Sequence, residues 1–116
     1  MLIVLPAMVM AVDENLHYRN YGNRTCTEWG QAREKRNIEY IAILNWISGY
    51  LTSYNAWQKD VYSITGENDL ENIYLWIDTY CKVNPSKSLV DGLSDLTLKF
   101  WPIRTEDAPD NQWRSE

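Results

Sequence analysis

Residues 37–57 read NIEYIAILNWISGYLTSYNAW, and this stretch decides the fold. Its apolar and aromatic residues recur at three- and four-residue steps, which is the spacing of one face of an α-helix. The residues of that face are Tyr40, Ile43, Leu44, Ile47, Leu51 and Tyr54. Trp46, Tyr50 and Trp57 broaden the stripe, so we expect a long central helix that begins after Asn37, a favourable N-cap residue.

Gly49 lies in the middle of this predicted helix. Glycine costs about 1 kcal/mol relative to alanine in a helix interior, because its backbone loses more freedom on folding. A closely packed neighbouring helix would account for a residue without a side chain here. We therefore predict that another helix approaches residue 49 closely.

Three further helices are predicted around the central one. Thr25 and Glu28 have the spacing of a capping box, which indicates a helix over about 26–36. Asp69 can cap a third helix over about 70–82. The spacing of the apolar residues therefore favours an all-α fold, a small bundle of about four helices.

The fourth predicted helix follows Asn84-Pro85, because a residue that precedes proline disfavours helical backbone. It starts after Ser86 or Ser88 and ends at Pro102. Its apolar stripe consists of Leu89, Leu93, Leu96 and Phe100. We divide the chain into an apolar leader (1–11), an irregular lead-in (12–24), a helical domain (25–101) and a polar tail that we expect to be mobile (102–116).

The leader, residues 1–11, reads MLIVLPAMVMA and carries no charge. About ten apolar residues are too few to cross a bilayer as a helix, but they match the apolar core of a secretory signal. A basic leading region is missing, so we interpret the segment as the remnant of a signal. A buried strand or helix of the mature fold is the alternative.

Two cysteines lie where the first predicted helix begins and where the third ends. An even number of cysteines in an exported chain of this length favours a structural disulfide. A reactive thiol or a metal site is the alternative, but zinc needs four ligands and the chain offers two cysteines and one histidine. Because a Cys-x-x-Cys spacing is missing as well, we predict a disulfide between Cys26 and Cys81.

The composition argues against several classes of function. The chain of 116 residues has a formal net charge of −5 and no clustered Lys/Arg stripe, which disfavours nucleic acids and anionic membrane surfaces. Its one histidine, His17, lies in the lead-in, far in sequence from any candidate nucleophile. We therefore predict a protein that is not an enzyme and needs no cofactor or metal.

The surplus of Trp and Tyr favours a protein partner. Six tryptophans and eight tyrosines exceed what four short helices can bury, and exposed aromatic clusters often anchor protein partners. Burial in the core is the alternative for each ring. The candidate partner-binding residues are Trp46, Tyr50, Tyr54, Trp57 and Trp76. The sequence leaves open whether the chain is a monomer or a homodimer.

The order of these features resembles two groups of small periplasmic proteins. Thr25-Cys26-x-x-Trp29 opens a helix, Trp46-Ile47-Ser48-Gly49-Tyr50-Leu51 lies in the next, and Cys81-x-x-Asn84-Pro85 closes the third. This order resembles HdeA/HdeB-like proteins of Gram-negative bacteria, and it is similar to Rap1a/Tai-type immunity proteins. Both resemblances imply a non-enzymatic periplasmic protein.

The two resemblances imply different partners. The first implies a stress chaperone that acid activates, because protonation of its carboxylates loosens the fold and exposes apolar surface to clients. The second implies tight binding to one cognate effector that degrades the cell wall. We expect the HdeA-like function, with the immunity protein as the alternative.

Overall fold

The computed structural model describes residues 19–109, and within this range the chain is helical. The elements are α1 (Cys26–Lys35), α2 (Ile38–Trp57), α3 (Leu70–Val83), α4 (Leu89–Phe100) and the 3₁₀ turn η2 (Trp101–Ile103). The predicted all-α fold of four helices is confirmed. The expected signal remnant (1–11), His17 and the last seven residues lie outside the described residues.

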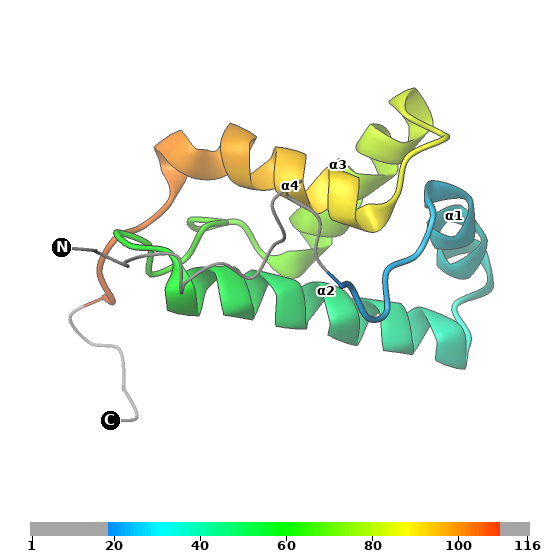
Figure 1. Ribbon diagram of the computed structural model, residues 1–116, viewed down its shortest axis with the longest axis horizontal. Helices are drawn as coiled ribbons and strands as arrows, with labels where there is room; N and C mark the ends of the chain where they lie inside the picture. Colours follow the sequence, from blue (N-terminus) through cyan, green and yellow to red (C-terminus); the bar gives the residue numbers. More distant parts are fainter. Residues whose placement is uncertain (1–18, 110–116) are drawn as a thin grey trace, which may run out of the picture.

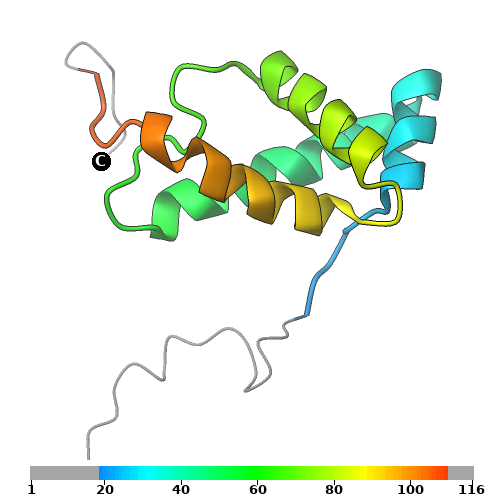
Figure 2. The same ribbon diagram turned by 90° about the horizontal axis from the view of Figure 1, so that it is seen from above.

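Helix α2 runs along the length of the domain, and the other three helices lie on one side of it (Figure 1). Helices α3 and α4 converge at the loop that connects them, and α1 packs across α2 and α3 at the same end of the molecule (Figure 2). The core lies between α2 and this layer. Its fully buried side chains are Trp29, Ile43, Ile47, Ile64, Ile73, Ile77, Leu89, Leu93 and Leu96.

Each helix begins at a polar side chain that satisfies free backbone N–H groups. Thr25 accepts a hydrogen bond from the Glu28 amide at 3.0 Å, and the Glu28 carboxylate accepts one from the Thr25 amide at 2.8 Å. Ser88 forms the same capping box with Asp91, which settles the choice between Ser86 and Ser88. Asn37 and Asp69 cap α2 and α3 as the sequence predicted.

The predicted disulfide joins Cys26, at the start of α1, to Cys81, near the end of α3. It closes a loop with a sequence separation of 55 residues. A cross-link of that span removes about 4 kcal/mol of conformational entropy from the unfolded chain at room temperature. Backbone hydrogen bonds tie the same end of α1 to α4, since Cys26 donates to Lys87 and Leu89 donates to Arg24.

The prediction for Gly49 is wrong within the described chain. A Cβ atom built on Gly49 would meet nothing within 4 Å, so no helix of residues 19–109 approaches it. Gly49 is exposed, and the other three helices all lie on one side of α2 (Figure 1).

The packed structure also extends past residue 101, where the sequence indicated a polar tail. The Tyr62 amide donates to the Thr105 carbonyl at 2.7 Å, and the Thr105 amide donates to Ser63 at 3.0 Å. The guanidinium of Arg104 lies 3.8 Å from the ring centre of Trp101 and donates to the Asp60 carbonyl. These contacts fasten the segment after α4 onto the connector between α2 and α3.

Candidate functional site

Four of the five predicted partner-binding residues form an aromatic strip along one flank of α2. The strip consists of Trp46, Tyr50, Tyr54 and Trp57, which follow one another at helical steps of three or four residues. Trp57 is 87% exposed, and the other three rings are half-buried against the core. The core therefore supports three rings of the strip, and the ring at its end, Trp57, is almost entirely exposed to solvent.

Contacts with two other segments hold the strip in place. The indole N–H of Trp46 donates to the Tyr21 carbonyl at 2.7 Å, and the Trp46 and Tyr50 rings lie 5.8 Å apart. The hydroxyl of Tyr50 lies 3.3 Å from that of Ser94 on α4. Gly22 has a φ of 94°, and a side chain there would overlap the Trp46 ring. The segment before α1 is thus shaped around Trp46.

Two shallow hollows lie along the strip. The first, of about 320 Å³, lies between Trp46 and the segment 19–21, and Gly49 and Tyr50 complete its lining. The second, of about 300 Å³, is lined by Tyr50, Ser53, Tyr54 and Trp57. Tyr50 lines both, and no charged side chain lines the second. The strip therefore offers ring faces and hydroxyl groups to a ligand, which suits amphipathic protein side chains.

Trp76 does not belong to this strip. It lies on α3, where its ring stacks on Tyr80 at 5.6 Å and meets the edge of Phe100 at 6.1 Å. It is half-buried and packs against the core. The structure therefore gives Trp76 a packing role between α3 and α4 and does not bring it together with the other four candidates.

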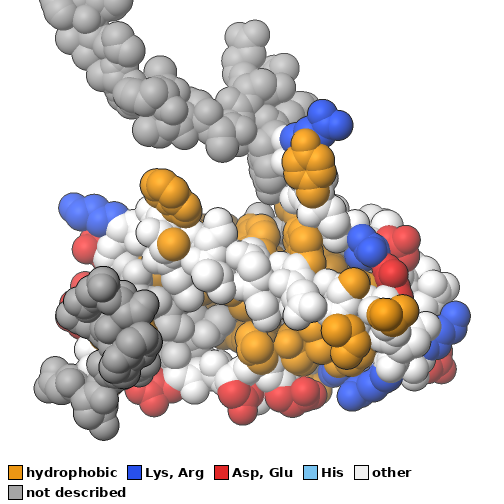
Figure 3. All heavy atoms as spheres, turned by 90° about the horizontal axis from the view of Figure 1, so that it is seen from below, with side chains coloured by type: hydrophobic (Ala, Val, Ile, Leu, Met, Phe, Trp, Pro, Cys, Tyr) orange, Lys and Arg blue, Asp and Glu red, His pale blue; other side chains and the backbone are white. Residues whose placement is uncertain are grey.

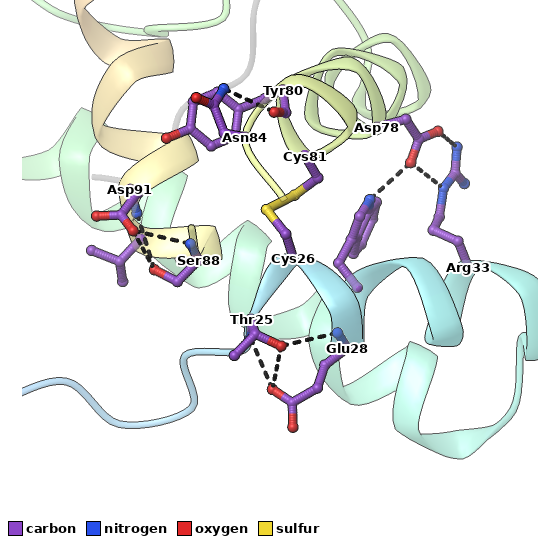
Figure 4. The surroundings of a disulfide bond; sticks show 12 residues. Thr25, Cys26, Glu28, Arg33, Asp78, Tyr80, Cys81, Asn84, Ser88 and Asp91 are labelled. Atoms are coloured by element: carbon purple, nitrogen blue, oxygen red, sulfur yellow. Dashed lines mark hydrogen bonds and ion pairs between the residues drawn. A yellow bond between two sulfur atoms is a disulfide. The ribbon is translucent and has the colours of Figure 1, made fainter. Parts of the chain in front are cut away.

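A polar cluster between α1 and α3 was not predicted from the sequence. The Asp78 carboxylate accepts hydrogen bonds from the Trp29 indole at 2.8 Å and from Arg33 at 2.6 and 3.0 Å (Figure 4). Arg33 also donates to the Tyr40 hydroxyl at 3.1 Å, and its side chain is only 12% exposed. The hydrogen bonds with Asp78 raise the pKa of Arg33 above its ordinary value. Arg33 therefore stays charged at any pH at which the domain is folded.

One signal in the sequence could have revealed this cluster. Arg33 follows Trp29 by one helical turn, and Asp78 directly follows Ile77 in the apolar stripe of its helix. A charged residue at the border of an apolar stripe often pairs across the helix interface, because burial disfavours an unpaired charge. Burial also raises the pKa of the neighbouring Tyr74.

Other chemical features are sparse in the part of the chain that the structure describes. No three His, Cys, Asp or Glu side chains within residues 19–109 are placed to hold a metal ion. In the same range, no helix has the length and apolar character that a membrane span requires. A polar hollow of about 440 Å³ lies between α3 and α4, with Tyr80, Asp91 and Asp95 among its lining residues.

Comparisons with known proteins identify no relative. No family model matches the chain, and no curated protein and no solved structure matches it. The HdeA/HdeB-like and Rap1a/Tai-type resemblances therefore stay predictions.

Proposed function

We propose that this chain is a non-enzymatic protein-binding domain that captures its partner through the aromatic strip. The observation that carries the proposal is the arrangement of the strip. Three of its rings are half-buried against the core, and the fourth, Trp57, is 87% exposed. Tryptophan and tyrosine dominate the binding energy of many protein interfaces, because each buries a large apolar area with few rotatable bonds.

The disulfide favours an oxidising compartment as the place where this binding occurs. Bonds of this kind persist outside the reducing cytosol. Together with the apolar leader, the Cys26–Cys81 bond favours the periplasm of a Gram-negative bacterium as the place of action.

Among protein-binding functions, an immunity-type inhibitor accords best with a preformed surface. Trp46 and Tyr50 are fixed by contacts to Tyr21 and Ser94 before any partner arrives. Fixed side chains lose little conformational entropy on binding, which favours tight capture of one cognate partner by the folded domain. We therefore propose a cell-wall-degrading effector as the partner.

An HdeA-like chaperone is the second candidate, and the Asp78 cluster favours it. The contact between α1 and α3 depends on the ion pair of Arg33 and Asp78, and its loss would leave a nearly buried charge without its main partner and weaken that contact. Loosening at that contact would expose apolar surface to clients while the disulfide keeps the two helices connected. This function requires the domain to lose its tertiary packing in acid.

Binding to a candidate effector tests the proposal. The product of a neighbouring gene that encodes a cell-wall-degrading enzyme would be titrated with the chain by calorimetry. For Trp57→Ala and Tyr54→Ala we expect affinity losses of about 30-fold or more, as for aromatic anchor residues of a protein interface. Leu98→Ala is the matched control, because Leu98 is 74% exposed on α4 and lines neither hollow of the strip. Equal affinities for all three variants would contradict the proposed binding surface.

Acid titration separates the two candidates. A folded-state inhibitor should keep its near-ultraviolet circular dichroism and bind little hydrophobic dye when the pH is lowered from neutral to strongly acidic. An HdeA-like chaperone should lose that signal, bind the dye and suppress the aggregation of an acid-denatured model enzyme. Loss of the signal without any effect on aggregation would contradict the chaperone function.

A further inference from the structure

The side of α2 that faces away from the core carries no charged residue. From residue 40 to residue 58 the sequence contains no Asp, Glu, Lys or Arg. The exposed positions of this side are Ile38, Ala42, Asn45, Gly49, Thr52, Ser53 and Ala56. A surface helix ordinarily places charged residues among the polar ones on its solvent side, whereas this side of α2 carries only uncharged residues.

The other helices do not share this property. The exposed positions of α1 include Glu28, Glu34 and Lys35, and those of α4 include Asp91 and Lys99. Figure 3, which looks onto the α2 side of the domain, shows uncharged atoms across the middle of this face, hydrophobic side chains beside them and most charged side chains around the edge. Ile38 and Ile41 on this helix are 84% and 52% exposed, which adds apolar area at its first turns.

Gly49 lies at the centre of these uncharged positions of α2, and it also lines the hollow between Trp46 and residues 19–21, which include Arg19. Its position would accept a side chain freely, since a Cβ atom there meets nothing within 4 Å. Alanine would stabilise the helix relative to glycine. A close approach by a second molecule would account for a missing side chain at this position.

We propose that two copies of this chain associate through α2, with the helices antiparallel and crossing at Gly49. A two-fold interface must be complementary to itself, so residues at equal distances on either side of the crossing face each other. Ala42 and Ala56 stand seven positions before and after Gly49, and Asn45 and Ser53 stand four positions before and after it. This symmetry of small, uncharged residues is what an antiparallel pair requires.

The charges at the two ends of α2 fit the same arrangement. Glu39 lies in the first turn, and Lys59 follows the last residue of the helix by two positions. An antiparallel pair places Glu39 of one copy, which also pairs with Arg24 of its own chain, near Lys59 of the other copy, whereas a parallel pair would bring the two Glu39 carboxylates together. Antiparallel packing also opposes the helix dipoles. These features favour a second copy over a partner of another kind.

Substitution of the central glycine tests the dimer on the purified chain, without any partner protein. Gly49→Arg introduces a charge at the crossing point, in space that the monomer leaves open. We expect wild type to sediment as a dimer at high concentration and Gly49→Arg as a folded monomer with unchanged far-ultraviolet circular dichroism. Gly30→Arg is the matched control, because Gly30 is also an exposed helical glycine with nothing within 4 Å. That control should stay dimeric.

Charge pairs test the direction of the helices. Asn45→Lys and Ser53→Glu should each weaken the dimer by about tenfold or more, since each buries an unpaired charge. The double variant should recover most of the affinity, because each introduced lysine then faces the introduced glutamate of the other copy. A parallel dimer would show no recovery. A monomeric wild type at all concentrations, or a Gly49→Arg protein that still dimerises, would overturn the proposal.

Discussion

At the scale of single residues, Asp78 carries the polar contact between α1 and α3. Its carboxylate accepts the Trp29 indole and two N–H groups of Arg33, and Arg33 is nearly buried. The sequence placed Trp29, Arg33 and Asp78 within two predicted helices, but it gave no information on which charged residue would pair across them. Pairing depends on how two helices are rotated against each other, and that rotation is a property of the whole core.

Asp78→Asn should therefore destabilise the domain by about 2 kcal/mol, because it leaves the Arg33 charge with too little compensation. The expected loss is at the low end for a buried ion pair, since the Asp78 side chain is 37% exposed. Urea denaturation followed by tryptophan fluorescence measures it. Lys99→Met removes the exposed pair with Asp95 and should cost less than about 0.5 kcal/mol. Equal effects of the two substitutions would show that the Asp78 cluster contributes no more than a surface pair.

At the scale of secondary-structure elements, the four helices could be predicted because their signals are local. Caps at Thr25, Asn37 and Asp69 and the steps of apolar residues depend on neighbours within one or two turns. The connector between α2 and α3 gave no such signal. It is polar in sequence, yet its Ile64 is fully buried and its amide donates to Asn55 at 2.8 Å. The apolar residues of this loop, Val61, Tyr62 and Ile64, have no helical periodicity, so only the tertiary fold reveals which of them is buried.

Ile64→Ala should cost about 3 kcal/mol of unfolding free energy, which is typical for a large side chain removed from a packed core. The connector would then act as part of the core rather than as a passive link. Val83→Ala removes an apolar side chain that is 72% exposed and should change stability by less than about 0.5 kcal/mol. The urea midpoints of the two variants measure these losses of stability. A loss below about 1 kcal/mol for Ile64→Ala would contradict the inclusion of the connector in the core.

At the scale of the whole molecule, α2 is central in sequence but lies at the surface on one side. We predicted a neighbouring helix at Gly49 on the assumption that the other helices surround α2. In the structure they all lie on one side of it, and none approaches Gly49. The proposed dimer would supply that neighbour. Its two-fold axis lies in the interface and perpendicular to the helices, so the aromatic strips of both copies would face the same side and form one larger surface for a partner.

If the fold and the association are coupled in this way, stability should depend on protein concentration. The free energy of unfolding of a dimer rises by about 1.4 kcal/mol for each tenfold increase in protein concentration, because association draws the equilibrium toward folded chains. Shared between two chains of this size, that gain should raise Tm by about 3–6 °C per tenfold step. Calorimetric scans of wild type and Gly30→Arg should show this slope, whereas Gly49→Arg should melt at one temperature throughout. A wild type whose Tm is independent of concentration would mean that α2 exposes its uncharged side in the folded monomer, and the reason for Gly49 would have to lie in a different partner.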